Sequence, residues 1–373
     1  MARRKYEHLV KPLSVATMPQ MIQDGGGFKN TGNADSIYWL NGRQHLEGLE
    51  LNFSWGFYTG LGDWHPGMDP HIHPYPEALV FVGLDPNNVE YLGAEISYCL
   101  GEELEEHSFD KPTVIIVPAG MPHCPSITKN VTNPIGYSFM IFSLGANPTT
   151  TWMGDGMTEK QIEIMKGSRA QAMAKLSKEE LVKLGTVMSM ESSFSEKRVH
   201  VSKETITHGH KYDHFFKPLK PFTFDLEKLT PAERAQYEKV TSGGMKPGPG
   251  NCNSLIWMYG KDLEGTPLNF TWGFYKSPGV WHRGPGNSDG AHIHPTDEVL
   301  VFVGTDPSNI DYLGAEISID MGKEHERYVF DKPTVVICPK GVPHNPVIAR
   351  YVDRPYAFFV ICLSGEHETA YVD

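Results

Sequence analysis

The residues HIHPYPE at 71–77, together with the later PAGMPH that ends at His123, carry most of the structural information in this chain. Side chains alternate between the two faces of a β-strand, so His71 and His73 point to the same side. Glu77 returns to that side if the strand resumes after the prolines, and the Pro-Gly turn brings His123 in from a neighbouring strand. Three imidazoles and one carboxylate form a site for a divalent transition metal, and an octahedral ion held by four ligands keeps two positions open.

The same pattern returns in the second half of the chain. HIHPTDE begins at residue 292, and PKGVPH ends at His344. The segment 71–123 aligns without a gap to 292–344, and 34 of its 53 positions are identical. Flanking segments also recur, since KYEHLVKPL returns as KYDHFFKPL and LNFSWGFY as LNFTWGFY. Self-similarity over this length indicates a duplicated domain rather than a short structural repeat.

Short runs of β-branched and aromatic residues dominate each copy. ALVFVG, TVIIVPAG and SFMIFSLG in the first copy match VLVFVG, TVVICPKG and AFFVICLSG in the second, and turn residues bound them. Such dense strands predict a closed barrel or jelly roll in each copy. Residues 157–190 are instead rich in helix formers. We therefore predict barrels over 1–148 and 206–373, joined by a helical linker over 149–205.

Both histidine sets resemble the two motifs of the cupin superfamily, in which His-x-His and a glutamate precede a Pro-x-Gly turn that ends in histidine. The resemblance covers most of the chain and implies a mainly β fold, a bicupin of duplicated cupin-type jelly-roll β-barrels joined by a short helical segment. It implies one divalent transition metal per barrel, Fe, Mn, Ni, Co or Zn. The implied ligands are His71, His73, Glu77 and His123 in the first barrel, and His292, His294, Glu298 and His344 in the second.

A loop just before each His-x-His pair repeats a Trp-His dipeptide, Trp64-His65 and Trp281-His282. A loop at that place caps the barrel mouth and can supply an acid or a base, because an imidazole titrates near neutral pH. His65 and His282 are therefore the candidate catalytic residues. The alternative is that the aromatic-polar pair only packs the loop.

The resemblance does not fix the reaction, because cupin folds carry several chemistries and some members only bind ligands. The leading hypothesis is a metal-dependent enzyme acting on a small anionic or enolisable molecule, with a dioxygenase favoured. The alternative is a non-oxidative lyase, decarboxylase or hydrolase. Oxalate decarboxylase itself matches less well, since LNFSWGFY and LNFTWGFY carry no arginine. A third hypothesis is a storage or binding bicupin, although such members usually lose ligands in one copy.

Composition narrows the partners and the compartment. The 373 residues carry a formal net charge of −12, which argues against nucleic acid or an anionic membrane as the main partner. The sequence has no apolar run long enough to span a membrane. Its five cysteines form no CxxC pair, which favours reduced thiols in a cytoplasmic protein. We expect a small-molecule substrate and a homodimer, since bicupins often self-associate.

Overall fold

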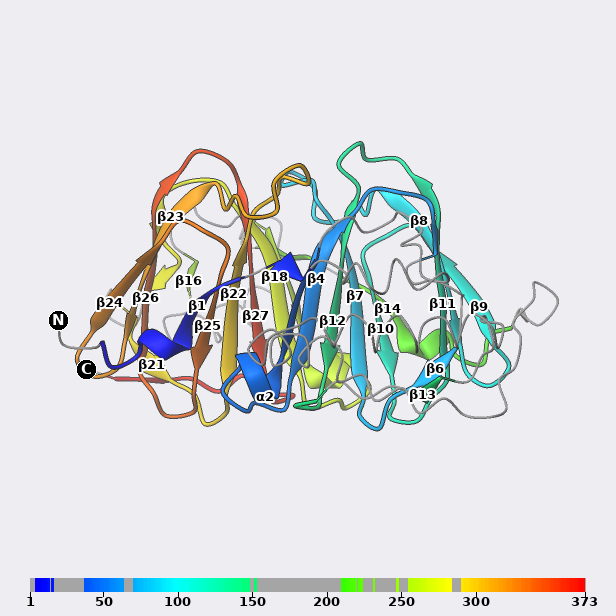
Figure 1. Cartoon of the computed structure of the whole chain (residues 1–373), viewed down its shortest axis with the longest axis horizontal. Helices are drawn as coiled ribbons and strands as arrows, with labels where there is room; N and C mark the ends of the chain where they lie inside the picture. Colours follow the sequence, from blue (N-terminus) through cyan, green and yellow to red (C-terminus); the bar gives the residue numbers. More distant parts are fainter. Residues whose placement is uncertain are drawn as a thin grey trace, which may run out of the picture. The chain divides into compact units, whose positions relative to one another are not determined.

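The computed structural model describes residues 4–13, 15–16, 37–63, 70–147, 151–152, 209–219, 221–223, 231, 246–247, 254–283 and 290–372. As predicted, these residues are almost all β, and they fall into two compact units. The first unit comprises Val15–Leu84 and Glu90–Pro218, and the second comprises Met1–Ser14, Asp85–Val89 and Leu219–Asp373. Figure 1 shows the antiparallel strands of each unit.

The first unit consists of two antiparallel sheets. The seven-stranded sheet has the order β14 (Phe216–Pro218), β10 (Thr113–Val117), β7 (Glu77–Gly83), β12 (Tyr137–Ser143), β4 (Asn52–Tyr58), β3 (Ile37–Asn41) and β2 (Val15–Ala16). The six-stranded sheet has the order β13 (Thr151–Trp152), β6 (His71–Ile72), β11 (His123–Val131), β8 (Ala94–Leu100) and β9 (Glu105–Phe109), with β5 (Gly62–Asp63) also pairing β11. A short helix, α2 (Gly42–His45), is capped by Asn41, whose side chain accepts a hydrogen bond from the Gln44 backbone N–H.

The second unit repeats this arrangement. Its seven-stranded sheet has the order β1 (Val10–Pro12), β25 (Thr334–Cys338), β22 (Glu298–Val303), β27 (Tyr356–Cys362), β18 (Asn269–Tyr275), β17 (Ser254–Met258) and β15 (Pro221–Thr223). Its six-stranded sheet has the order β24 (Glu326–Phe330), β23 (Ala315–Met321), β26 (His344–Val352), β21 (His292–Ile293) and β28 (Ala370–Tyr371), with β19 (Gly279–Val280) also pairing β26. A two-stranded ribbon joins β16 (Lys246–Pro247) and β20 (His282–Arg283). The 3-10 turns η1 (Glu7–Leu9) and η4 (Gly260–Asp262) belong to this unit, and η3 (Asp213–Phe215) belongs to the first unit.

The core of the first unit fills the space between the inner faces of its two sheets. Apolar residues of β7, β10 and β12 meet those of β8 and β11 in one buried cluster. Phe81 stacks on Phe139 with ring centroids 4.3 Å apart, and Phe302 stacks on Phe358 at 4.4 Å in the second unit. Aromatic pairs of this kind add to the stabilisation from buried apolar area. The runs ALVFVG and VLVFVG thus form the central strands of two equivalent cores.

One short segment, here called an arm, precedes each copy in the sequence, at residues 5–13 and 211–219. Contrary to the predicted boundaries, each arm pairs with the other copy and not with the one that follows it. The N-terminal arm belongs to the second unit, where β1 pairs β25 with Val10 opposite Val336. The arm before the second copy belongs to the first unit, where β14 pairs β10 with Phe216 opposite Ile115. The arms share six of nine residues, KYEHLVKPL and KYDHFFKPL, and both pair through backbone hydrogen bonds. The predicted boundaries at 148 and 205 themselves lie outside the described residues.

Each arm is fastened at the same corner of the barrel that it covers. The Tyr212 hydroxyl donates a 2.6 Å hydrogen bond to Glu103, and the Lys211 ammonium lies 2.7 Å from the same carboxylate. In the second unit the Tyr6 hydroxyl and the Lys5 ammonium contact Glu324 at 3.0 and 2.8 Å. The hydrogen bonds from Lys211 and Tyr212 lower the pKa of Glu103 to about 2.

The linker predicted over 149–205 is described only at Thr151–Trp152. These two residues form β13, which pairs with β6 of the first unit opposite Ile72 and His71. Two residues near the predicted start of the linker therefore form a strand, which adds to the six-stranded sheet of the first unit. The rest of the predicted helical segment lies outside the described residues.

Gly101→Ala is expected to loosen the second arm. Gly101 has a φ of +82°, and a Cβ there would lie 2.2 Å from the Tyr212 ring, so the ring must leave its place. We expect a loss of about 2–4 kcal/mol in urea unfolding, the sum of the left-handed backbone cost and the lost packing. Gly48→Ala is the matched control, because Gly48 has a φ of +87° with nothing within 4 Å. Equal losses in both variants would contradict the arm contact.

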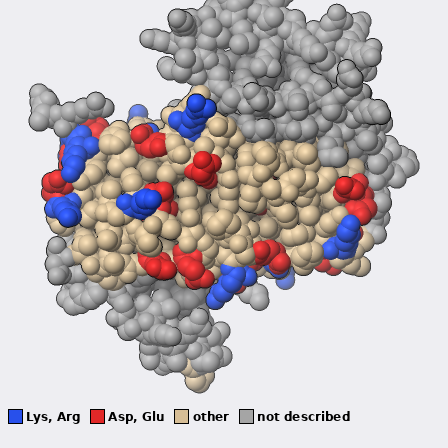
Figure 2. All heavy atoms as spheres, turned by 90° about the horizontal axis from the view of Figure 1, so that it is seen from below, with Lys and Arg blue, Asp and Glu red and all other residues tan. Residues whose placement is uncertain are grey.

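Surface charges are mixed in the part of the chain that is described. On the face in Figure 2, Lys and Arg side chains lie singly among Asp and Glu rather than in one basic patch.

Within the described ranges, no helix has the length and apolar character needed to cross a lipid bilayer. Cys99, Cys124, Cys338 and Cys362 are buried free thiols, and Cys252 lies outside those ranges.

Candidate metal centres

The first centre forms where three strands of the first unit meet. β6 places His71 directly opposite His123 of β11, and β7 begins at Glu77. The imidazole of His71 lies 4.2 Å from that of His123 and 4.9 Å from that of His73, measured between ring centroids. The ligand atoms of the three histidines all lie within 4.8 Å of one another. The four predicted residues thus lie together, but not by alternation along one strand, because β6 ends at Ile72 and Glu77 opens β7 of the other sheet.

The second centre has nearly the same geometry. The ring centroid of His292 lies 4.8 Å from that of His294 and 4.5 Å from that of His344. Glu298 opens β22 as Glu77 opens β7, and its Oε2 lies 3.0 Å from His344 Nε2 and 3.6 Å from His294 Nε2. All four side chains are at most 5% exposed.

Backbone carbonyls fix the orientation of the imidazoles. His294 Nδ1 lies 2.7 Å from the Glu368 carbonyl, His344 Nδ1 lies 3.2 Å from that of Val342, and His123 Nδ1 lies 3.0 Å from that of Met121. A carbonyl only accepts, so each Nδ1 carries the proton and each Nε2 has a free lone pair. This assignment follows from the hydrogen-bond network.

The donor set fits a divalent cation. The buried Nε2 atoms of His294 and His344 have no hydrogen-bond partner, although His344 Nε2 lies only 3.0 Å from Glu298 Oε2. Two atoms that both offer lone pairs repel at that distance unless a cation lies between them. Adjacent ligands at bond lengths of roughly 2.1 Å are about 3 Å apart on an octahedral ion. The arrangement therefore supports a divalent metal, whose identity the donors leave open.

Each carboxylate presents one oxygen to the histidines and has the other held by the protein. In the first centre the Ser143 hydroxyl donates a short hydrogen bond to Glu77 Oε1, while Oε2 faces His73 and His123. Burial by itself would raise the pKa of Glu77, but the neighbouring His73 and His123 imidazoles and the hydrogen bond from Ser143 lower it. The carboxylate is therefore ionised and oriented as a single-oxygen ligand.

Sequence reasoning missed the residues that hold the second carboxylate. The Cys362 thiol donates to Glu298 Oε1 at 3.4 Å, and His367 Nδ1 lies 3.3 Å from the same sulfur. Burial raises the pKa of Cys362 well above its usual value, so the thiol stays protonated. Burial also lowers the pKa of His367 to about 4. Comparing the ends of the aligned strands SFMIFS and AFFVIC would have revealed the serine and the cysteine.

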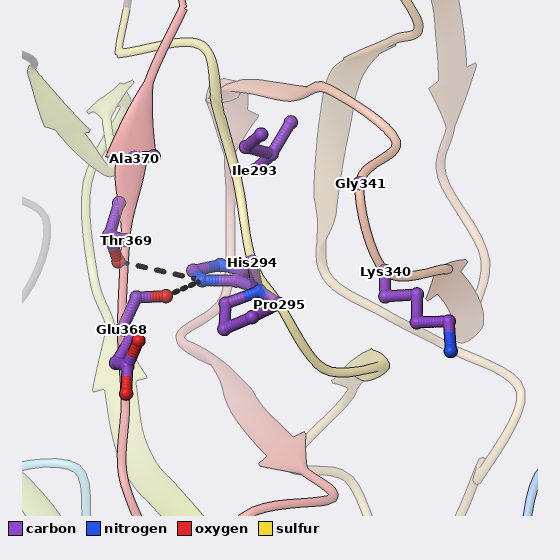
Figure 3. Close-up of a pocket in the computed structure, with 8 residues that line it drawn as sticks. All are labelled: Ile293, His294, Pro295, Lys340, Gly341, Glu368, Thr369 and Ala370. Atoms are coloured by element: carbon purple, nitrogen blue, oxygen red, sulfur yellow. Dashed lines mark hydrogen bonds between the residues drawn. The ribbon is translucent and has the colours of Figure 1, made fainter.

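A hollow of about 460 Å³ lies against the second centre. Figure 3 shows Lys340 on one side and Glu368 and Thr369 on the other, with His294 between them. His294 turns its Nδ1 toward this hollow, where it contacts the Glu368 carbonyl and the Thr369 hydroxyl. Since Nε2 points the opposite way toward Glu298, the hollow lies behind this ligand and is separate from the metal position.

The structure places the two candidate catalytic histidines only in part. His65 lies outside the described residues, and of His282 only the backbone is described, in β20 opposite Pro247. The neighbouring Trp281 packs edge-on against Phe358 at 5.0 Å and donates its Nε1–H to the Tyr275 hydroxyl. This tryptophan therefore packs its loop onto the core.

Comparison with known proteins finds solved structures of similar fold. No family model matches the chain, and no curated protein matches its sequence. A mutant of Bacillus subtilis oxalate decarboxylase, 13% identical, superposes with a TM-score of 0.52 over 98% of this chain and 79% of its own. A structure of that enzyme from work on its Mn(II) centres gives 0.51 at the same identity and coverage. The formate complex of Lactobacillus farciminis oxalate decarboxylase gives 0.50 at 13% identity, over 98% of this chain and 88% of its own. The chain therefore shares the fold of these proteins, as the duplicated β-barrel prediction expected.

Proposed function

We propose that this chain is a metal-dependent bicupin enzyme that acts non-oxidatively, as a decarboxylase, lyase or hydrolase, on a small organic monoanion. The observation that carries the proposal is the charge balance of the two buried donor sets. One carboxylate and three neutral imidazoles around a divalent ion leave a net charge of about +1. No lysine or arginine is buried among the described residues, so nothing else there offsets a second negative charge.

The barrel walls offer polar contacts to such a substrate. Ser54 shares the inner face of β4 with Tyr58, and its buried hydroxyl has no hydrogen-bond partner. In the second unit the buried Trp257 Nε1–H also has no partner, and the ring meets His367 edge-on at 5.2 Å. Buried polar atoms without partners are costly, so a bound ligand that pairs with them gains affinity. When bound, a divalent metal would supply Lewis-acid polarisation of a carbonyl or carboxylate.

The structural relatives support the non-oxidative alternative rather than the dioxygenase hypothesis. Those reported above are oxalate decarboxylases, although likeness at 13% identity establishes only the fold. Oxalate itself is a dianion, and the inner-facing residues of β4, Asn52, Ser54, Gly56 and Tyr58, include no cation. We therefore propose a monocarboxylate or an enolate as the substrate. Storage is disfavoured because both donor sets are complete.

The test is turnover with and without oxygen. Protein loaded with Mn²⁺ is incubated with a panel of small 2-oxo, 3-oxo and hydroxy monocarboxylates, and products are followed by NMR in air and under argon. We expect turnover of at least one substrate at equal rates in both atmospheres. Turnover that stops under argon and consumes oxygen would establish the dioxygenase instead. Binding without turnover of any compound would favour the non-catalytic alternative.

His65 and His282 are the proposed proton carriers of this reaction. Their repeated position before each His-x-His pair supports the assignment. We expect His65→Ala or His282→Ala to reduce turnover by about 10²–10⁴-fold while metal content stays unchanged, since that is the usual contribution of a general acid or base. The variant that loses turnover identifies the catalytic barrel.

The homodimer and the cytoplasmic location are proposed on the sequence arguments alone.

A further inference from the structure

A fourth histidine reaches the second centre from outside the repeated motifs. His367 lies between β27 and β28, and its ligand atom and those of His294 and Glu298 all lie within 4.8 Å of one another. The ring centroids of His294 and His367 are 4.7 Å apart. This spacing is close enough for one ion to contact all three side chains.

The neighbours of His367 orient a lone pair. The Cys362 thiol donates its hydrogen bond to Glu298, so its sulfur can only accept a hydrogen bond from His367 Nδ1, which lies 3.3 Å away. That bond assigns the proton to Nδ1 and leaves the lone pair on Nε2, as in His294 and His344. The edge contact with Trp257 holds the ring from another side.

At the sequence position equivalent to His367 the first copy has no histidine. Ser143 and Cys362 are equivalent, because each lies opposite the glutamate of its own centre in the sheet. Five residues beyond them the sequence has Pro148 in one copy and His367 in the other. Proline has no side-chain nitrogen that can bind a metal. Position 148 lies outside the described residues, so the comparison rests on sequence alone.

We propose that His367 is a fifth protein ligand at the second centre, so that the two centres bind their ions with different numbers of protein ligands. The inference rests on the proposed function, because it presupposes a divalent ion held by His292, His294, Glu298 and His344. Five protein ligands leave one of six octahedral positions for solvent or substrate, whereas the first centre keeps two. A site with two adjacent positions suits a chelating substrate. The second centre thus holds its ion more firmly, and the first is the one fitted for turnover.

The experiment isolates the second centre. In the full chain carrying His71→Ala and His73→Ala, Mn²⁺ is titrated while electron paramagnetic resonance measures free ion and water proton relaxation counts bound water. We expect about one exchangeable water on the ion, and about two after His367→Ala, because water replaces the lost imidazole. The dissociation constant should rise by at least about tenfold. Added imidazole should lower the water count again.

Two controls separate the possible failures. His8→Ala removes an exposed histidine of the same unit and should change neither the water count nor the affinity. The first-centre protein, carrying His292→Ala and His294→Ala, should show about two waters with or without His367. Mn²⁺ binding that His367→Ala leaves unchanged in both affinity and water count would overturn the fifth ligand alone. If the isolated second centre binds no Mn²⁺, the proposed metal site fails as well. Circular dichroism of each variant checks that the barrels are folded.

Discussion

Protein reconstituted with Mn²⁺ is expected to hold about two ions per chain, and removing two histidines from either centre is expected to remove one of them. Each centre places three imidazoles and a carboxylate in one buried cluster, so His71→Ala with His73→Ala leaves too few donors to hold a divalent ion. The pair His292→Ala and His294→Ala should do the same in the second unit. Elemental mass spectrometry after removal of free metal gives the count.

The same variants have a second readout in stability. An ion bound only by the folded state stabilises it by about 4 kcal/mol at a thousand times its dissociation constant. The wild type should therefore lose thermal stability when a chelator is added, each double variant should lose less, and the quadruple variant should not respond. An unchanged count of two ions in the quadruple variant would mean that the eight predicted ligands are wrong.

Deleting residues 1–13 is expected to expose β25 of the second unit and to leave β10 of the first unit protected. β1 covers the outer edge of β25, so its loss turns a paired strand into an edge whose amides reach water. Hydrogen exchange followed by mass spectrometry should show faster exchange in peptides spanning Thr334–Cys338. The expected change is large, because strands of a barrel core are normally among the slowest to exchange.

The reciprocal variant tests the other arm. Tyr212→Ala removes the ring that packs on Gly101 and the hydrogen bond to Glu103, so exchange should rise in Thr113–Val117 and not in β25. Faster exchange of β10 after the N-terminal deletion would show that each arm covers its own copy, contrary to the structure.

The metal centres could be predicted from the sequence because their positions depend on local rules. Alternation along an extended segment predicts His71 and His73 on one face, and the repeat shows that the spacing of all four donors recurs. The barrel fold followed from short apolar runs that match between the copies. These features need no knowledge of long-range partners.

The arm exchange could not be predicted in the same way. KYEHLVKPL and KYDHFFKPL are too similar for side chains to distinguish the two edges, and β1 and β14 pair through the backbone. His367 was missed for a different reason. It lies where GANPTT and SGEHET no longer resemble each other, so the internal comparison gave no signal there.

The exchanged arms affect how the chain folds during synthesis. Lys5 leaves the ribosome long before its partner Glu326, which is 321 residues further along the chain. The N-terminal arm must therefore wait, unpaired, until the second barrel has been translated, whereas the other arm follows a first barrel that is already complete. Closing the second barrel is thus the last of these events during synthesis, and each half expressed alone would lack the strand that covers its edge in the full chain. A split of this gene between the two motifs would yield fragments that become whole only by binding each other.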